Sequence, residues 1–233
     1  MHRLAILIAC LSAFGATQAP CAQGRPKNIR VTVEYIEVSH QLVTALMTGP
    51  HADSGPKLHA RMRELVKENK AHILETSIIT ARSGYRARVE SVMEHIYPTE
   101  YEPPSLSSRP PPEEREGKAR TRNPTAFETQ NVGITLDIAP VFQPGKPFID
   151  LRFTQEMTAL LRYNTLYEHQ DQWGDTSIRF PIYDAQESKC EATLLNGQFS
   201  LLNLLAPTHK DGGPDTTRKI LLFVRADVIS IGS

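Results

Sequence analysis

Apolar and polar residues alternate over several stretches of this chain. Near the start, Ile29, Val31 and Val33 are separated by polar residues, a period of two that is typical of a half-buried β-strand. The same period returns over residues 127–142 and 148–161, where most of the intervening positions are polar or charged. These stretches are therefore predicted to be strands of a sheet with one buried face.

One segment changes to a helical period. Leu58, Met62, Leu65 and Val66 recur at i, i+4, i+7 and i+8 within residues 57–70, with charged residues between them. The spacing predicts an amphipathic helix that turns these four side chains toward the core.

Glycine-containing turns separate the predicted strands. Gly84 ends a strand over 71–84 and is expected to turn the chain back into a second strand over 85–98, so that the two form a hairpin. Asn196-Gly197 is one of the strongest hairpin signals in a single sequence, and is expected to join strands over 189–195 and 199–205.

Further strands are expected at 178–182 and 220–231, and Pro144-Gly145 is expected to turn the chain between the two longest ones. About eight strands stand against one or two helices. The fold class predicted is α+β, mainly antiparallel.

A proline-rich stretch interrupts this pattern at 102–125. Its first 21 residues, EPPSLSSRPPPEEREGKARTR, contain five prolines and many charges. Such a composition cannot bury much apolar surface, so an extended or disordered loop is predicted. The loop is expected to lie inside one domain, because the sequence on both sides needs partners to form a sheet.

The first two dozen residues have the features of a secretory signal peptide. A short basic start precedes an apolar run at 4–16, and small residues follow where a signal peptidase can cut. The run is well below the roughly 20 residues that a membrane-spanning helix needs. We expect a signal peptide at 1–23 and one core domain at 24–233. An uncleaved anchor, or a lipoprotein acylated at Cys10, are the alternatives.

Charge and cysteine content argue against several classes of function. Lys plus Arg and Asp plus Glu both number 26, which gives no electrostatic case for binding nucleic acid or an acidic membrane surface. Of the three cysteines, Cys10 lies in the signal and Cys21 near its end, so Cys190 is expected to be unpaired. No disulfide framework is predicted.

No residue pattern points to catalysis. The histidines lack the spacing that places two metal ligands on one face, and no nucleophile or phosphate-binding motif is found. His51 and Asp53 lie in a Gly/Pro loop, where a surface metal contact is the alternative to a solvated loop. Cys190 is interpreted as a buried, inert thiol rather than a nucleophile. We predict no enzyme activity, no metal and no cofactor.

Four aromatic residues come after the longest predicted strand. Trp173 belongs to a polar loop, and Tyr163, Tyr167 and Tyr183 lie near it. They are interpreted either as an interfacial girdle of a membrane protein or as a cluster within a loop.

The segment FETQNVGITLDIAPVF is similar to the part of bacterial secretins in which an aromatic residue and a short polar stretch precede V-G-x-x-L-x-V-x-P. The matching residues here are Val132, Gly133, Leu136, Ile138 and Pro140.

Other pieces resemble the secretin core in the same order. RVTVEYIEVS is similar to its opening, and the helix at 57–70 with the strand pair after it is similar to its next elements. ATLLNGQFSLLNLL resembles its later hairpin, and ILLFVRADVI resembles its closing strand. The resemblance covers residues 28–231.

This resemblance implies an exported protein of the periplasm or outer membrane of a Gram-negative-type bacterium. In secretins the core domain contributes strands to a large ring-shaped β-barrel through which folded proteins, pili or phage leave the cell. The implied partners are further copies of the chain, forming a ring, or other proteins of a secretion apparatus.

The interval at 206–219, APTHKDGGPDTTRK, lacks the V-P-x-L-x-x-I-P-x-x-G-x-L-F segment that secretins carry before the closing strand. Small ring-forming domains upstream of the core are also missing from this sequence. These departures favour a second hypothesis, a soluble periplasmic interaction module that keeps the secretin fold without forming a pore.

The residues expected to have structural roles are Gly84, Val132, Gly133, Leu136, Pro140, Asn196 and Gly197. A glycine within a strand, as at 133, indicates a bulge or a close approach of another backbone. Glu34 and Glu37 are candidates for inter-subunit ion pairs with Arg or Lys of a neighbour. Their alternative is the exposed face of a half-buried strand.

Overall fold

The computed structural model describes residues 27–49, 54–102, 123–171 and 174–229. It contains two four-stranded antiparallel sheets and two helices, which confirms the α+β class. The elements are β1 (Asn28–Ser39), α1 (His40–Met47), α2 (Gly55–Lys67), β2 (Ala71–Arg82), β3 (Ala87–Tyr101), β4 (Pro124–Phe142), β5 (Phe148–Asp171), β6 (Gly174–Leu195), β7 (Phe199–Leu205) and β8 (Arg218–Ile229).

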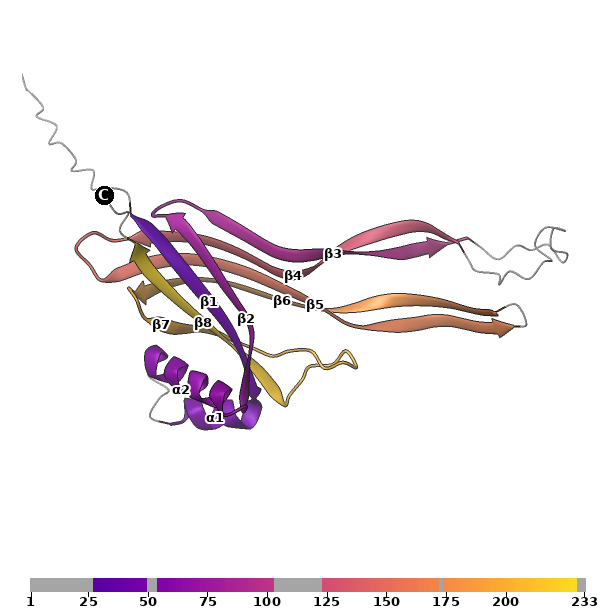
Figure 1. Ribbon diagram of the computed structural model, residues 1–233, viewed down its shortest axis with the longest axis horizontal. Helices are drawn as coiled ribbons and strands as arrows, with labels where there is room; N and C mark the ends of the chain where they lie inside the picture. Colours follow the sequence, from indigo (N-terminus) through magenta and orange to yellow (C-terminus); the bar gives the residue numbers. More distant parts are fainter. Residues whose placement is uncertain (1–26, 50–53, 103–122, 172–173, 230–233) are drawn as a thin grey trace, which may run out of the picture.

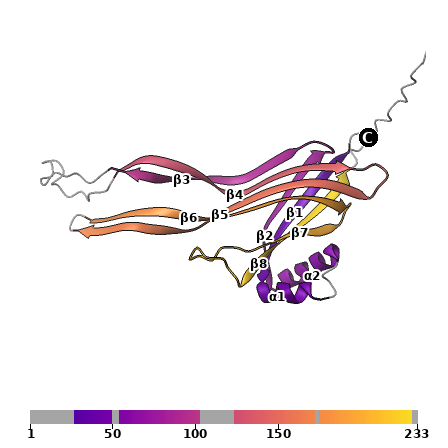
Figure 2. The same ribbon diagram turned by 180° about the vertical axis from the view of Figure 1, so that it is seen from behind.

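The molecule has three layers (Figures 1 and 2). Sheet A, in the order β2-β1-β8-β7, lies in the middle. The two helices cover one of its faces, and its other face packs against the base of sheet B, in the order β3-β4-β5-β6. The strands of sheet B then continue well beyond sheet A as two long hairpins.

The central strand β1 contributes side chains to two cores. Val31, Val33 and Tyr35 belong to the core between the sheets, whereas Ile36 and Val38 belong to the core beneath the helices. A register shift in the pairing with β2 falls between Tyr35 and Ile36. The alternation seen in the sequence thus separates the core between the sheets from the exposed Arg30 and the half-buried Thr32. From Ile36 onward the other face of the strand is buried beneath the helices.

Sheet B supplies the other half of the larger core. Leu136, Ile138, Leu151 and Phe153 point from β4 and β5 toward sheet A and are almost completely buried. One polar contact crosses this core, in which the Tyr35 hydroxyl donates to the side-chain oxygen of Gln155 at 3.1 Å. Such a buried hydrogen bond fixes the offset of the two sheets, because either group left unpaired would lose its solvation without compensation.

Helix α2 forms where the period of 3.6 predicts it. Leu58, Met62 and Leu65 are buried against sheet A, and Pro56 occupies the first turn, where a missing N–H is tolerated. The helix lies so close to β7 that a Cβ on Gly55 would be 2.6 Å from the Phe199 carbonyl oxygen. Helix α1 was not located from the sequence. It begins at His40 and is capped by Ser39, whose hydroxyl accepts from the Leu42 N–H at 3.4 Å.

Both glycine hairpins expected from the sequence are wrong in their pairing. Gly84 and Gly197 do lie in turns with positive φ, of 82° and 81°. However, β2 pairs with β1 and β3 with β4, so the turn at Gly84 carries the chain from sheet A to sheet B. The turn at Asn196-Gly197 carries it back, from β6 to β7. A local turn signal does not determine which sheet the next strand joins.

The strands of the β5–β6 hairpin are longer than expected. β5 has 24 residues and does not end at Leu161, and β6 is one strand of 22 residues rather than two short ones. β6 already begins at Gly174, directly after Trp173 of the expected polar loop. Weak alternation past Leu161 hid this continuation, because both faces of the strands are largely exposed there.

Several expectations concern residues outside the described ranges. These are the signal peptide at 1–23, His51 and Asp53, Trp173, and most of the proline-rich loop. At the base of that loop the Glu102 N–H donates to the Asn123 carbonyl oxygen at 3.0 Å, and β4 begins at Pro124. None of the described helices is long and apolar enough to cross a membrane.

Candidate assembly surface

Sheet B has two unpaired edges within the described part of the chain. β3 pairs only with β4, and β6 pairs only with β5. An edge strand presents a row of free N–H and C=O groups that can pair with another strand. Because the sheet has four antiparallel strands, β3 and β6 run in opposite directions at its two ends.

The face of sheet B that is turned away from sheet A carries charges in cross-strand rows. One row runs Arg88, Asp137, Thr154 and Lys189. A shallow groove of about 580 Å³ is lined by residues of this face. Arg86 and Arg88 flank Asp137, and the hydrogen bond from Arg86, followed by the nearby positive charges, lowers the pKa of the Asp137 carboxyl.

Charges at the two edges are paired along their own strands. Arg88 contacts Glu90 at 2.5 Å on β3, and Lys189 contacts Glu187 at 2.6 Å on β6. All four side chains are substantially exposed, so these contacts contribute little to the stability of the single chain. The edge charges are therefore free to take cross-strand partners.

Sheet B divides into two arms at Gly133. The pairing of β4 with β5 ends at Gly133 and Thr158, and beyond this point β4 pairs only with β3 and β5 only with β6. Figure 1 shows the β3–β4 arm and the β5–β6 arm running side by side from there. The φ of Gly133 is 137°, and a Cβ there would overlap the Ser91 carbonyl oxygen. Since the pairing with β3 has no register shift at this residue, the glycine permits a close backbone approach rather than a bulge.

A histidine joins the two arms beyond the division. His95 of β3 has its Nδ1 2.6 Å from the hydroxyl of Tyr183 on β6 and its Nε2 2.9 Å from the hydroxyl of Tyr163 on β5. A neutral imidazole donates from one nitrogen and accepts at the other, so both hydroxyls can be satisfied at once. Tyr97 lies beside this group, with its ring 6.0 Å from that of Tyr183. We call His95, Tyr163 and Tyr183 the clasp.

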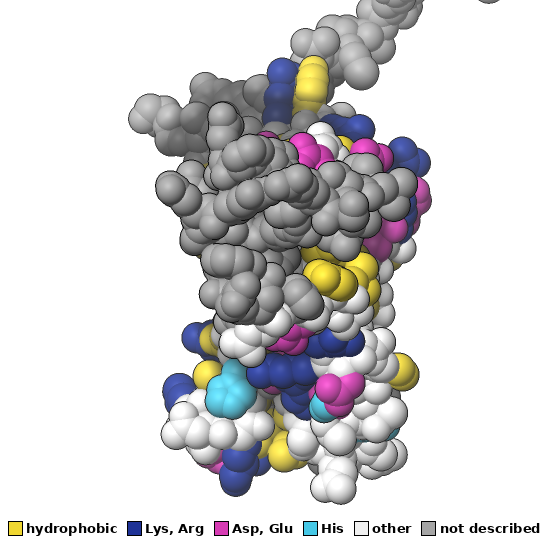
Figure 3. All heavy atoms as spheres, turned by 90° about the vertical axis from the view of Figure 1, so that its right-hand side faces the viewer, with side chains coloured by type: hydrophobic (Ala, Val, Ile, Leu, Met, Phe, Trp, Pro, Cys, Tyr) yellow, Lys and Arg dark blue, Asp and Glu magenta, His cyan; other side chains and the backbone are white. Residues whose placement is uncertain are grey.

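The arms expose large apolar side chains. Ile96, Phe127 and Leu166 are 61%, 58% and 63% exposed. Tyr163 and Tyr167 lie on β5 and Tyr183 on β6, so the interpretation of these tyrosines as a loop cluster is wrong. An interfacial girdle stays a prediction. Seen from the arm end, charged and hydrophobic side chains are intermingled on the surface (Figure 3).

Glu34 and Glu37 both have partners within the chain. Glu34 is only 8% exposed and its Oε2 lies 2.9 Å from Nε2 of His59 on α2. The His59 ring stacks on Phe199 of β7 at 3.7 Å. Glu37 accepts from Arg218 at 2.9 Å. An exposed strand face is therefore wrong for Glu34, and a contact of either carboxylate with a neighbouring copy stays a prediction.

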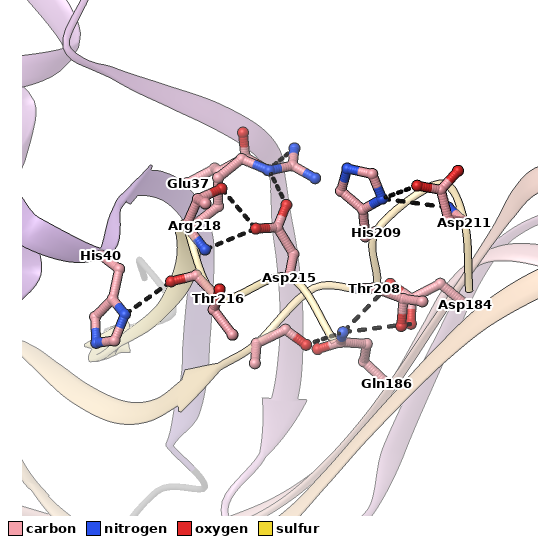
Figure 4. A network of polar contacts seen from close by, with 12 residues as sticks. Glu37, His40, Asp184, Gln186, Thr208, His209, Asp211, Asp215, Thr216 and Arg218 are labelled. Carbon is pink, nitrogen blue, oxygen red and sulfur yellow. Dashed lines mark hydrogen bonds and ion pairs between the residues drawn. The ribbon is translucent and has the colours of Figure 1, made fainter. Parts of the chain in front are cut away.

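A polar network fixes the segment between β7 and β8 (Figure 4). The Asp215 carboxylate accepts from the Thr217 hydroxyl at 2.6 Å, from Arg218 at 2.7 Å and from the Thr217 N–H at 2.8 Å. These bonds hold its pKa well below the usual range. At the other end of the segment, the Thr208 hydroxyl donates to Asp184 of β6 at 2.7 Å. The interval that lacks the secretin segment is thus a short loop bonded to β6 and, through Thr216 and Thr217, to His40 at the start of α1.

This chain is similar in fold to the secretins. The type II secretin GspD from enteropathogenic Escherichia coli has a TM-score of 0.45 at 11% identity, over 90% of this chain and 71% of that one. GspD in the ETEC complex with the pilotin AspS has a TM-score of 0.47 at 12% identity, over 90% of this chain and 51% of that one. This chain therefore spans about half of that secretin.

The type IV competence pilus secretin PilQ of V. cholerae gives a TM-score of 0.43 at 11% identity, over 89% of this chain and 62% of that one. No family model and no curated protein matches the sequence.

The predicted structural residues lie in two groups in this secretin-like fold. Val132, Gly133, Leu136 and Pro140 all belong to β4, and Gly84 meets this strand by donating its N–H to the Pro140 carbonyl oxygen at 2.8 Å.

The second group is the turn between β6 and β7, which docks on β8. Asn196 accepts from the Val228 N–H at 3.0 Å, and the Gly197 N–H donates to the Ala226 carbonyl oxygen at 2.8 Å. The sequence did not reveal His95 or His59, because their partners lie on strands far away along the chain. It also did not reveal Asp215, although its partners Thr217 and Arg218 are local, because they belong to no recognised motif.

Candidate chemistry is sparse among the described residues. They contain no group of three or more His, Cys, Asp or Glu side chains that could hold a metal ion. Cys190 is unpaired and half-buried beside the core between the sheets, and burial raises the pKa of its thiol. A raised pKa keeps the sulfur protonated at neutral pH and so lowers its reactivity.

Proposed function

We propose that this protein is a secretin-like component of a bacterial protein-secretion or pilus-export apparatus, and that it acts by assembling with further copies of itself at the outer membrane. One observation carries the proposal: sheet B has two open edges, β3 and β6, of opposite direction. Placing β6 of one copy beside β3 of the next continues the antiparallel order without a break. Such a head-to-tail contact closes into a ring when the rotation between copies allows it.

The order of elements supports this proposal. The strand β1, the helix α2 and the strands β2 and β3 succeed one another as in the secretin resemblance. The V-G-x-x-L-x-I-x-P residues lie at the centre of β4, where the sheet divides into its two arms. The best-matched residues are therefore those that determine how sheet B continues past the core.

The length of the arms also supports it. β5 and β6 have 24 and 22 residues, whereas about 9–11 residues per strand suffice to cross a bilayer. The exposed apolar residues Ile96, Phe127 and Leu166 all lie on the arms. We propose that the protein is exported, that the arms are the part that reaches the membrane, and that the role is non-catalytic and needs no cofactor.

Cell fractionation combined with a denaturing gel tests the proposal. The native cells are separated into periplasm and outer membrane, and each fraction is run with and without heating. We expect the chain in the outer membrane as a high-mass band that resists SDS and collapses to the monomer on boiling. A chain recovered only as a monomer in the periplasm would contradict assembly at the membrane.

A second function is favoured by the segment between β7 and β8. In place of the secretin segment stands a short loop whose Asp215 and Thr208 are bonded to Arg218 and Asp184. A chain without that segment fits a soluble periplasmic module that binds another protein through a sheet edge. In the same fractionation this alternative predicts a soluble protein that co-purifies with one other component of the apparatus.

A further inference from the structure

The outward charges on the two edges of sheet B form complementary series. Along β3 the outward positions carry Arg88 and Glu90, and along β6 they carry Glu187, Lys189 and Glu191. Each of these side chains is more than 40% exposed. An antiparallel junction would place members of the two series directly opposite one another.

A junction that simply extends the rows of the sheet brings like charges together. Residues 88 and 189 lie in one row of sheet B, and residues 90 and 187 in the next. Continuing these rows into the next copy would set Arg88 beside Lys189 and Glu90 beside Glu187. Like charges directly opposite on two strands destabilise their pairing.

We propose that the next copy binds with its β3 displaced by two residues, so that Arg88 faces Glu191 and Glu90 faces Lys189 across the junction. Arg88, Glu90 and Lys189 then change from contacts along their own strands to contacts across the junction. Glu191 already lies 3.0 Å from Arg152 of β5 and gains a second cationic partner. The inference rests on the self-association proposed above and adds the register in which the copies meet.

Neighbouring displacements are disfavoured by the same residues. A shift of two residues in the opposite direction places Arg86 beside Lys189, which offsets the attraction that Arg88 would gain. A shift of four residues in the proposed direction places Glu90 beside Glu191, and also two further glutamates together. A shift of an odd number would turn the outward face of β3 toward the core side, because side chains alternate along a strand. The edge charges thus select the register by repulsion as well as by attraction.

The geometry of a closed sheet agrees with this choice. Strands that close into a cylinder must tilt, which requires their register to advance around the ring. If the rows continue without displacement, the register does not advance from one copy to the next. The proposed junction advances it by two residues per copy. Val89 also gains a neighbour, because this apolar side chain is 37% exposed at the free edge and the displacement sets it opposite Cys190.

Cys190 provides a direct test with the charges intact. Val89→Cys would face the natural Cys190 of the next copy in the proposed register, Ala87→Cys would face it in undisplaced rows, and Ser91→Cys would face it after a shift of four. At residues 87–91, where all four strands of sheet B are paired, β3 and β6 of one chain are three strand spacings apart, roughly 14 Å. They approach each other only beyond Gly133, at the clasp. The separation at residues 87–91 exceeds the limit of about 7 Å between Cα atoms for a disulfide, so any bond must join two copies.

Each full-length variant is oxidised in its outer-membrane fraction, denatured by heat and run without reductant. We expect a ladder of covalent oligomers from Val89→Cys, about tenfold stronger than from Ala87→Cys or Ser91→Cys. In the proposed register, positions 87 and 91 lie two residues along β3 from the position opposite Cys190, which is too far for a disulfide of normal geometry. Adding Cys190→Ser to Val89→Cys must abolish the ladder. A stronger ladder from either of the other two variants overturns the register.

The remaining outcomes separate this inference from the proposed function. An SDS-resistant assembly without cross-links in any variant means that copies join through another surface, which overturns the register and leaves self-association standing. Absence of both assembly and cross-links overturns both.

A charge exchange gives an independent measurement. Glu90→Lys should reduce the yield of the SDS-resistant assembly by about tenfold, since an attractive pair becomes repulsive at every junction. Adding Lys189→Glu should restore most of it. Glu64→Lys makes the same change of charge on a side chain 60% exposed on α2, on the face of sheet A opposite sheet B, and should leave the yield unchanged. Failure of the double variant to recover, while its near-ultraviolet circular dichroism stays native, would count against the proposed pairing.

Discussion

Position 133 has no room for a side chain. The Ser91 carbonyl oxygen and the Val92 Cα of the neighbouring strand occupy the space that a Cβ would need, and φ is positive. Gly145, in the turn between β4 and β5, also has positive φ, of 79°, but nothing lies within 4 Å of its Cβ position. The two glycines therefore separate the effect of crowding from the effect of backbone conformation.

We expect Gly133→Ala to lower the free energy of unfolding by about 3 kcal/mol, because strain and steric overlap add. Gly145→Ala should lower it by about 1 kcal/mol, since only the conformational preference changes. Urea unfolding followed by circular dichroism measures both. Equal losses of unfolding free energy in the two variants would show that the overlap with Ser91 is relieved at no measurable cost.

The strands of the two arms are paired to each other only up to Gly133 and Thr158. Beyond that point the clasp connects β3 to β5 and β6 through the two hydrogen bonds of His95. A hydrogen bond of this kind contributes only about 1 kcal/mol, which is enough to bias the position of an arm but not to hold the core together.

His95→Ala is therefore expected to widen the distribution of distances between the arms with little loss of overall stability. Spin labels at Thr129 of β4 and Thr165 of β5, read by pulsed electron resonance, would measure the distance. His72→Ala, on the exposed face of β2, is the matched control and should leave the distribution unchanged. An unaltered distribution in His95→Ala would mean that packing alone positions the arms.

How far the sequence predicts these elements depends on where their partners lie. The period of Leu58, Met62 and Leu65 located α2 because a helix is a local structure. Gly84 and Gly197 were predicted as turns for the same reason, but the sheet that each following strand joins depends on contacts far along the chain. The clasp was not predicted because His95 and its tyrosines are distant in sequence and belong to no spaced motif.

At the scale of the whole molecule, carboxylates whose pKa is lowered in the fold couple stability to pH, Asp215 and Asp137 among them. Asp215 has its pKa lowered by its bonds to Thr217 and Arg218, and Asp137 has its pKa lowered by Arg86. In the unfolded chain an aspartate titrates near about 3.9. A pKa that is lower in the folded state gives stability that is complete above the unfolded value and is lost as the pH falls toward the folded value.

We therefore expect the melting temperature to be nearly constant down to about pH 5 and to fall progressively below about pH 4. Asp215→Asn should melt lower at pH 7 and show a shallower decline in acid, because one of the responsible carboxylates is gone. Asp211→Asn, on an exposed side chain, should keep the original slope. A decline as steep in Asp215→Asn as in the unaltered chain would refute the role of this network. Thermal scans from neutral pH down to about pH 2 provide the measurement.

The order of strands in sheet A has a consequence for how the protein is made. Ile29 of β1 is paired with Val228 of β8, so the central pair of that sheet joins the two ends of the described chain. The four strands of sheet B are consecutive and can zip up as hairpins while the chain is still emerging. β1, in contrast, lacks its partner β8 until the end of the chain is available, so its apolar Val31 and Val33 stay incompletely buried until then. Folding in the cell is therefore finished by the C-terminal strand, and a chain interrupted before β8 would expose β1 as a ready template for aggregation.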